Sequence, residues 1–279
     1  CIIMKITYIY HSGFLVESAD AYYIFDYYRA DFPVTDADKP VYVFVSHRHP
    51  DHYNPYVFEI LREKKVRRMT GIISYDIKPR NYTSHMEGVE IIAAEPDKEY
   101  TLDNGALVRT LRSTDKGVAY VVTFDDGGVP RSVYHAGDLN DWVWEGEDER
   151  VNKWMTGSYR RYLTAVEGMH FDAVMVPVDS RQGDDMFRGI EYLLEKVKAD
   201  AVYPMHYWDK PEVIMQFAGK YPQYADIIRY TEDRMDRYSV IEDKNPREIV
   251  LLRGSGCVYK KCTFCDYYSD SGKDEDVNY

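Results

Sequence analysis

The sequence contains no apolar run that approaches the length of a membrane span, so no transmembrane helix is expected. Residues 1–10 lack the basic region, apolar stretch and cleavage site of a secretory signal, and we take Met4 as the natural start. Only four cysteines are present, and three of them crowd near the end, which does not resemble a secreted disulfide framework. We therefore expect a cytoplasmic protein.

A net positive charge is also missing, because the formal net charge is −12 at pH 7 and no basic face is evident. This charge argues against a nucleic-acid backbone as the main partner. The hydrophobic content of 45% is ordinary for a globular protein and suffices for a sizeable core. With 279 residues, the chain fits one large α/β domain, or one such domain with an appendage.

The most informative stretch is Val41–His52, where an apolar, strand-like run ends in three histidines and one aspartate. Their spacing is His-x-His-x-Asp-His, formed by His47, His49, Asp51 and His52. Alternate residues of an extended segment point the same way, so the first two histidines can address one ion and the last pair a neighbouring ion. Imidazole and carboxylate suit zinc, iron, manganese or nickel better than calcium. A single histidine at a strand end is usually structural, but this cluster predicts a metal site.

This motif resembles the signature of the metallo-β-lactamase fold hydrolases, and the resemblance extends over roughly Met4–Tyr238. Ile6–Glu17, with a His-Ser turn between two expected strands, is similar to the branch that includes ascorbate-6-phosphate lactonase-like proteins. The resemblance implies an α/β (α+β) fold, a four-layer αββα sandwich, over residues 4–245. Residues 246–279 would form a short C-terminal appendage that contains a cysteine loop.

Two later segments follow the order of the same family. A strand that runs into Gly-Asp ends at Asp138, and another strand ends at His206. The resemblance implies that Asp138 bridges two metals, as a shared anion between dications should, and that His206 is the last histidine ligand. The family normally supplies a third histidine for the first metal, but the matching segment, residues 110–118, has none. Three outcomes stay open: one bound metal, two metals with Asp115 as the substitute ligand, or degraded catalysis.

The reaction implied is the attack of a metal-activated water on an ester, lactone or phosphodiester of a small molecule. Asp51 would orient the water, and His11 and His135 are further catalytic candidates, although a supporting or substrate-facing role is favoured for His135. The alternative is a non-catalytic or sensor domain that binds a metal or ligand on the same fold, and a di-iron redox variant is a third option. Asp179 and Arg181 are interpreted as a structural ion pair. One or two divalent ions, zinc first, and a small-molecule substrate are expected, and a homo-oligomer is left open.

The end of the sequence holds Cys257, Cys262 and Cys265 after a glycine-rich lead-in. They resemble the cluster loop of radical S-adenosylmethionine enzymes, in which three thiolates hold an iron–sulfur cluster. The first spacing, Cys-x4-Cys, departs from the usual Cys-x3-Cys, and only 14 residues follow the last cysteine. A remnant or fusion start, a zinc site and reduced thiols are the alternatives.

Apolar periodicity predicts the remaining elements. Helices are expected at Pro55–Arg68, with Asn54 as the N-cap and Lys64, Lys65, Arg67 and Arg68 complementing the dipole of its last turn, and at Val151–Gly168, Asp185–Val197 and Pro211–Lys220. Strands are expected at Lys5–Tyr10, Phe14–Ser18, Ala21–Tyr27, Gly71–Tyr75, Val89–Ala93, Glu99–Leu102, Val118–Thr123, Val133–Ala136, Phe171–Val178 and Ala201–Met205.

Overall fold

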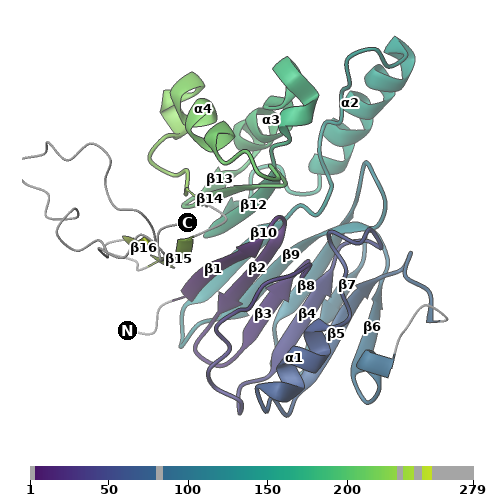
Figure 1. Cartoon of the computed structure of the whole chain (residues 1–279). Helices are drawn as coiled ribbons and strands as arrows, with labels where there is room; N and C mark the ends of the chain where they lie inside the picture. The colour runs from purple at the N-terminus through teal and green to yellow at the C-terminus, as the bar shows by residue number, and fades with distance from the viewer. Residues whose placement is uncertain (1–3, 80–83, 231–234, 242–246, 253–279) are drawn as a thin grey trace, which may run out of the picture.

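The computed structural model describes residues 4–79, 84–230, 235–241 and 247–252, the last two ranges as backbone strands only. Two β-sheets lie at its centre, with helices on their outer sides (Figure 1). The first sheet has the order β16-β15-β1-β2-β3-β4-β5-β6. Its strands are β1 (Met4–Tyr10), β2 (Gly13–Glu17), β3 (Tyr22–Phe25), β4 (Val41–Val45), β5 (Met69–Ser74), β6 (Glu90–Ala94), β15 (Met235–Ile241) and β16 (Arg247–Leu252).

The second sheet has the order β14-β12-β10-β9-β8-β7. Its strands are β7 (Glu99–Thr101), β8 (Leu107–Arg112), β9 (Val118–Asp125), β10 (Pro130–His135), β12 (Ala173–Pro177) and β14 (Val202–Met205). A small additional sheet pairs β11 (His170–Phe171) with β13 (Lys198–Ala199). The helices are α1 (Val57–Glu63), α2 (Glu149–Leu163), α3 (Arg188–Lys196) and α4 (Glu212–Lys220), with short 3₁₀ turns at Ser84–Met86, Ser180–Asp185 and Pro222–Tyr224.

Strand β4 explains why the layers form, because all five of its residues are buried. Val41, Val43 and Val45 pack into the core beneath α1, whereas Tyr42 and Phe44 pack into the core shared by the two sheets. A strand that is covered on both faces must be apolar throughout, and β4 pairs in parallel with both of its neighbours. Helices α3 and α4 contribute to the core on the far side of the second sheet (Figure 1). The layers are therefore helix, sheet, sheet and helix, as predicted.

Helix α1 is shorter than predicted, and its interpretation needs correction. It ends at Glu63, and Lys65 adopts a left-handed φ of 67°, so Arg67 and Arg68 lie beyond the helix and cannot complement its dipole. Lys64 caps the helix and pairs with Asp31 at 2.9 Å. The other helices lie where periodicity placed them, with ends that differ by a few residues. Strand β8 was not predicted, because Arg109, Thr110 and Arg112 interrupt its apolar pattern.

The first sheet continues to the end of the described region. Backbone pairing of β15 with β1 and of β16 with β15 adds the strand at residues 247–252 to the first sheet. The predicted division at residue 245 remains a prediction, and the cysteines at 257, 262 and 265 lie outside the described residues. Among the helices that the structure describes, none has the length and apolar character needed to cross a membrane.

Candidate metal centre

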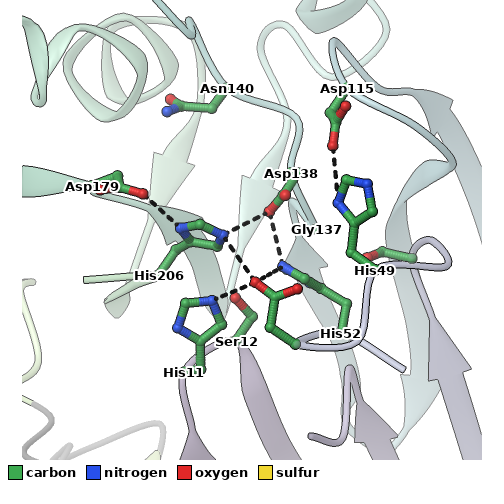
Figure 2. Close-up of polar contacts among 12 residues, drawn as sticks. His11, Ser12, His49, His52, Asp115, Gly137, Asp138, Asn140, Asp179 and His206 are labelled. Carbon is green, nitrogen blue, oxygen red and sulfur yellow. Dashed lines mark hydrogen bonds and ion pairs between the residues drawn. The ribbon is translucent and has the colours of Figure 1, made fainter. Parts of the chain in front are cut away.

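The predicted ligands lie together because the topology brings their loops to one edge of the two sheets. The carboxyl ends of β4, β10 and β14 meet there, and the turn between β1 and β2 and the loop between β8 and β9 join them (Figure 2). Each of these loops contributes at least one imidazole or carboxylate. The residues that come together are His11, His47, His49, Asp51, His52, Asp115, Asp138 and His206.

An inner group consists of His11, Asp51, His52 and His206, whose ligand atoms all lie within 4.8 Å of one another. Asp51 Oδ2 is 3.3 Å from His11 Nε2, 3.9 Å from His52 Nε2 and 3.9 Å from His206 Nε2. The three histidines are buried, and the aspartate is partly exposed. His11, predicted as a catalytic residue, therefore occupies the position of a fourth ligand.

An outer group consists of His47, His49, Asp115 and Asp138, also within 4.8 Å of one another. His49 Nδ1 and His47 Nε2 lie 3.4 Å and 4.0 Å from Asp115 Oδ2. Asp115 thus lies where the substitute for the missing histidine was predicted. This group is more open than the inner one, since His49 and Asp115 are 38% and 34% exposed.

Asp138 lies between the two groups. Its Oδ1 is 3.2 Å from His52 Nε2 and 3.5 Å from His206 Nε2 (Figure 2). Its Oδ2 is 3.4 Å from His47 Nε2. Each carboxylate oxygen therefore faces a different group, which is the arrangement that a bridging ligand requires.

The donor atoms fit a pair of divalent ions. Among the described residues, both ring nitrogens of His11, Nε2 of His52 and Oδ1 of Asp138 are buried without a hydrogen-bond partner. Leaving such an atom unsatisfied costs about 1–3 kcal/mol, and these atoms converge on one small region. Cations would satisfy them, and a set of imidazoles and carboxylates suits zinc, manganese, iron or nickel.

The buried carboxylate of Asp26, at the end of β3, supports the inner group and was not identified as a site residue from the sequence. Its Oδ2 accepts hydrogen bonds from His52 Nδ1 at 2.8 Å and from Ser46 Oγ at 2.6 Å, and its Oδ1 accepts from Ser46 N at 2.7 Å. Burial acts to raise the pKa of Asp26, but the hydrogen bond from His52 and the nearby imidazoles lower it below its usual value. The ionised carboxylate holds the proton of His52 on Nδ1, which leaves Nε2 available as a ligand.

Asp179 orients the imidazole of His206 as Asp26 orients that of His52. It accepts a hydrogen bond from His206 Nδ1 at 3.0 Å (Figure 2). It also pairs with Arg181, whose Nε lies 2.9 Å from Oδ1. The predicted ion pair is present, but it is not only a part of the scaffold, because the same carboxylate orients a candidate ligand.

His135 does not face the cavity. Its ring is fully buried. Nε2 lies 2.9 Å from Ser12 O, and Nδ1 accepts a hydrogen bond from Gly137 N at 3.1 Å. It stacks on Phe25 at 5.1 Å, and burial lowers the pKa of the ring. The predicted catalytic or substrate-facing role does not agree with this position. The supporting role does, since His135 ties the turn of His11 to the segment before Asp138.

A cavity of about 370 Å³ opens over both groups. Trp142, Trp144 and Met155 were not predicted to line it, because they belong to the loop and helix after β10. The lining residues are His49, Asp51, Thr114, Asp115, Asp138, Trp142, Trp144, Met155, Arg181, His206 and Trp208.

Comparison with known proteins agrees with this geometry. Residues 5–150, more than half of the chain, match the family model described as "Beta-lactamase superfamily domain". The chain therefore belongs to this family, and its fold is that of the metallo-β-lactamases. No curated protein matches the sequence. The likenesses to the ascorbate-6-phosphate lactonase branch and to radical S-adenosylmethionine enzymes remain predictions.

Solved structures share the fold at low sequence identity. Igni18, a metallo hydrolase from Ignicoccus hospitalis, is 20% identical with a TM-score of 0.57, and the match covers 86% of this chain and 99% of that chain. A protein from Parabacteroides distasonis described as "Putative metal-dependent hydrolase" is 16% identical with a TM-score of 0.54, and the match covers 81% of this chain and 91% of that chain. CmlA, a diiron β-hydroxylase from Streptomyces venezuelae, is 10% identical with a TM-score of 0.56, and the match covers 86% of this chain and 54% of that chain.

Proposed function

We propose that the protein is a metal-dependent hydrolase that acts on an ester, lactone or phosphodiester of a small molecule. One observation carries the proposal: two adjoining groups of four candidate ligands share Asp138 between them and open into a cavity of about 370 Å³. A scaffold with no catalytic role has no evident reason to keep so many buried, unsatisfied donor atoms in one place.

The inner group would hold one ion and the outer group a second, zinc being the ion we propose for both. Bound there, the ions would supply Lewis acidity and bring the pKa of a bound water towards neutral. The family resemblance supports this arrangement, and so do the imidazole and carboxylate side chains that make up the two groups. Asp26 and Asp179 would keep the ring nitrogens of His52 and His206 turned towards the ion.

Asp51 is the group that we propose to orient the attacking water. Burial acts to raise its pKa, but the contact of Oδ2 with His11 Nε2 at 3.3 Å and the other nearby imidazoles lower it well below its usual range. Asp51 is therefore a carboxylate at neutral pH, and it lines the cavity with part of its surface exposed. An ionised, accessible oxygen can accept a hydrogen bond from water and fix its direction of attack.

The alternative is a metal-binding or ligand-sensing domain without turnover. The exposure of His49 and Asp115 favours it, because an open outer group with a carboxylate in place of histidine would hold its ion less firmly. A cytoplasmic location and a small-molecule partner remain parts of the proposal that rest on the sequence.

The deciding experiment measures metal content per chain by elemental analysis for zinc, manganese, iron and nickel. His206→Ala should remove the inner ion, and His170→Ala is the matched control, since His170 is exposed and pairs with Asp200. Two equivalents in the wild type, about one in His206→Ala and two in the control would support a binuclear site. A wild-type protein that stays empty in metal-replete buffer would overturn the proposal.

Turnover is then measured with the metal-loaded protein on a panel of lactones, aryl esters and phosphodiesters. Hydrolysis of any member that depends on added metal supports the hydrolase. A protein that holds both ions but hydrolyses no member would favour the alternative, and bound iron would direct the assays to oxidative chemistry.

A further inference from the structure

Three tryptophans, Trp142, Trp144 and Trp208, form two aromatic walls of the cavity. Trp144 stacks in parallel on Trp142, with ring centres 5.9 Å apart and an interplanar angle of 3°. Trp142 is itself buried and donates its indole N–H to Asp138 O at 2.9 Å, which ties this wall to the bridging residue. Trp208 forms a second wall, with its ring centre 4.3 Å from that of His11. The walls are therefore held by the candidate ligands themselves.

Arg181 lies near the indoles of Trp144 and Trp208, and among the described residues that line the cavity it is the only arginine or lysine. Its guanidinium carbon is 5.4 Å from the ring centre of Trp208 and 6.0 Å from that of Trp144. The fully buried Asp179 engages Nε and Nη2, which fixes the plane of the guanidinium. The side chain is nevertheless 54% exposed, so a charged, oriented edge faces the cavity.

We propose that the cavity recognises a substrate that combines a flat, apolar body with an anionic group, either a carboxylate or a phosphate. The body would lie against Trp144 and Trp208, and the anion would bind the free edge of Arg181. This inference names the substrate class of the proposed hydrolase and rests on that function.

The physical reasons are shape and charge. Indole faces bind flat apolar groups, and a guanidinium binds carboxylate or phosphate through directed, charge-assisted hydrogen bonds. A volume of about 370 Å³ suits a small molecule. Asp51, Asp115 and Asp138 line the same cavity, so an anion needs a cationic partner there besides the bound ions.

Calorimetric titration of the metal-loaded protein tests the inference without requiring turnover. The probes are 2-naphthoate, 2-naphthylphosphonate and the uncharged, similarly shaped 2-naphthamide, with acetate as an anion that lacks the flat body. We expect at least one naphthyl anion to bind about tenfold more tightly than the amide. The preferred anion identifies a carboxylate or a phosphate. Equal affinity for the amide and both anions would overturn the inference.

Two variants separate the roles of the residues. Arg181→Met, with its metal content checked, should abolish the preference for the anion, whereas the exposed Arg112→Met makes the same change in charge away from the cavity and should retain it. Trp144→Ala should weaken binding of the naphthyl probes about tenfold and leave acetate unchanged. Anion preference that survives in Arg181→Met would mean that the ions alone hold the anion, and would overturn the role of Arg181.

Hydrolysis of phenyl acetate and 4-acetoxybenzoate separates this inference from the proposed function. Selective anion binding without turnover would refute the hydrolase and leave the ligand class supported. Turnover of both esters with equal kcat/KM, together with equal binding of 2-naphthoate, 2-naphthylphosphonate and 2-naphthamide, would refute the ligand class and leave the hydrolase supported.

Discussion

His52 Nδ1 lies 2.8 Å from Oδ2 of Asp26, and both side chains are buried beneath the candidate metal centre. The pair joins two neighbouring parallel strands, because Asp26 follows β3 and His52 follows β4 by one turn of chain. The carboxylate fixes the imidazole before any ion binds. The inner group is thus preorganised by residues that do not themselves face the ion.

Asp26→Asn should lower the affinity of the inner group for metal by about 10–100-fold, because an amide cannot fix the proton of His52 as a carboxylate does. Competition with a chromophoric chelator measures this affinity. Asp226→Asn, at an exposed position, is the control and should bind as the wild type does. An unchanged affinity in a folded Asp26→Asn protein would contradict the supporting role.

Asp115 should decide the strength of the outer group. Asp115→Ala removes the oxygen 3.4 Å from His49 Nδ1, so we expect the loss of about one equivalent of metal while the inner ion remains. Asp115→His restores the histidine that the sequence lacks and should slow removal of the outer ion by a chelator. If neither variant changes the metal content or its release, Asp115 is not a ligand.

Gly117 permits the close approach of the β8–β9 loop to the histidine motif. Its φ is +74°, and a Cβ atom there would lie 1.8 Å from Ser46 O and 2.6 Å from His47 Cβ. Gly117→Ala should therefore cost more than about 2 kcal/mol of unfolding free energy and displace the outer group. Gly105→Ala has a similar φ of +85° but open space, so it should cost only about 1–2 kcal/mol in urea unfolding. Equal costs would show that backbone conformation alone matters.

Tyr221 makes the stability of the α3–α4 packing sensitive to alkaline pH. Burial, and then the hydrogen bond that Tyr221 donates to Glu191 at 2.8 Å, raises its pKa to about 12 from an ordinary value of 10.0. The unfolded chain loses this proton first, so the contribution is intact below pH 10 and is lost as pH rises towards 12. Tyr221→Phe should lose less stability than the wild type between pH 9 and pH 12 in denaturant unfolding. Parallel losses in the two proteins would contradict the assignment.

The order of the motifs along the chain was enough to predict the fold and most of the candidate ligands. His47, His49, Asp51 and His52 follow one buried strand, and the apolar character of that strand reflects its two covered faces. Asp138 and His206 were expected from similar strand ends, and the place of Asp115 from the missing histidine. The sequence pattern near each strand end is enough for this prediction, because residues at the carboxyl ends of parallel strands converge whatever the exact conformation of their loops.

Tertiary structure decided what depends on contacts between distant segments. His11 joins the inner group because its turn lies beside the end of β14, where His206 N donates to His11 O at 3.3 Å. Its left-handed φ of 57° has no distinct sequence pattern. The hydrogen bond from His206 to Asp179 joins residues that are 27 positions apart in the sequence, and the hydrogen bond from His52 to Asp26 joins residues 26 positions apart. The sequence by itself determined which side chains could bind metal, and only the packing of the two sheets decided which of them meet, which carboxylates hold them and which tryptophans enclose them.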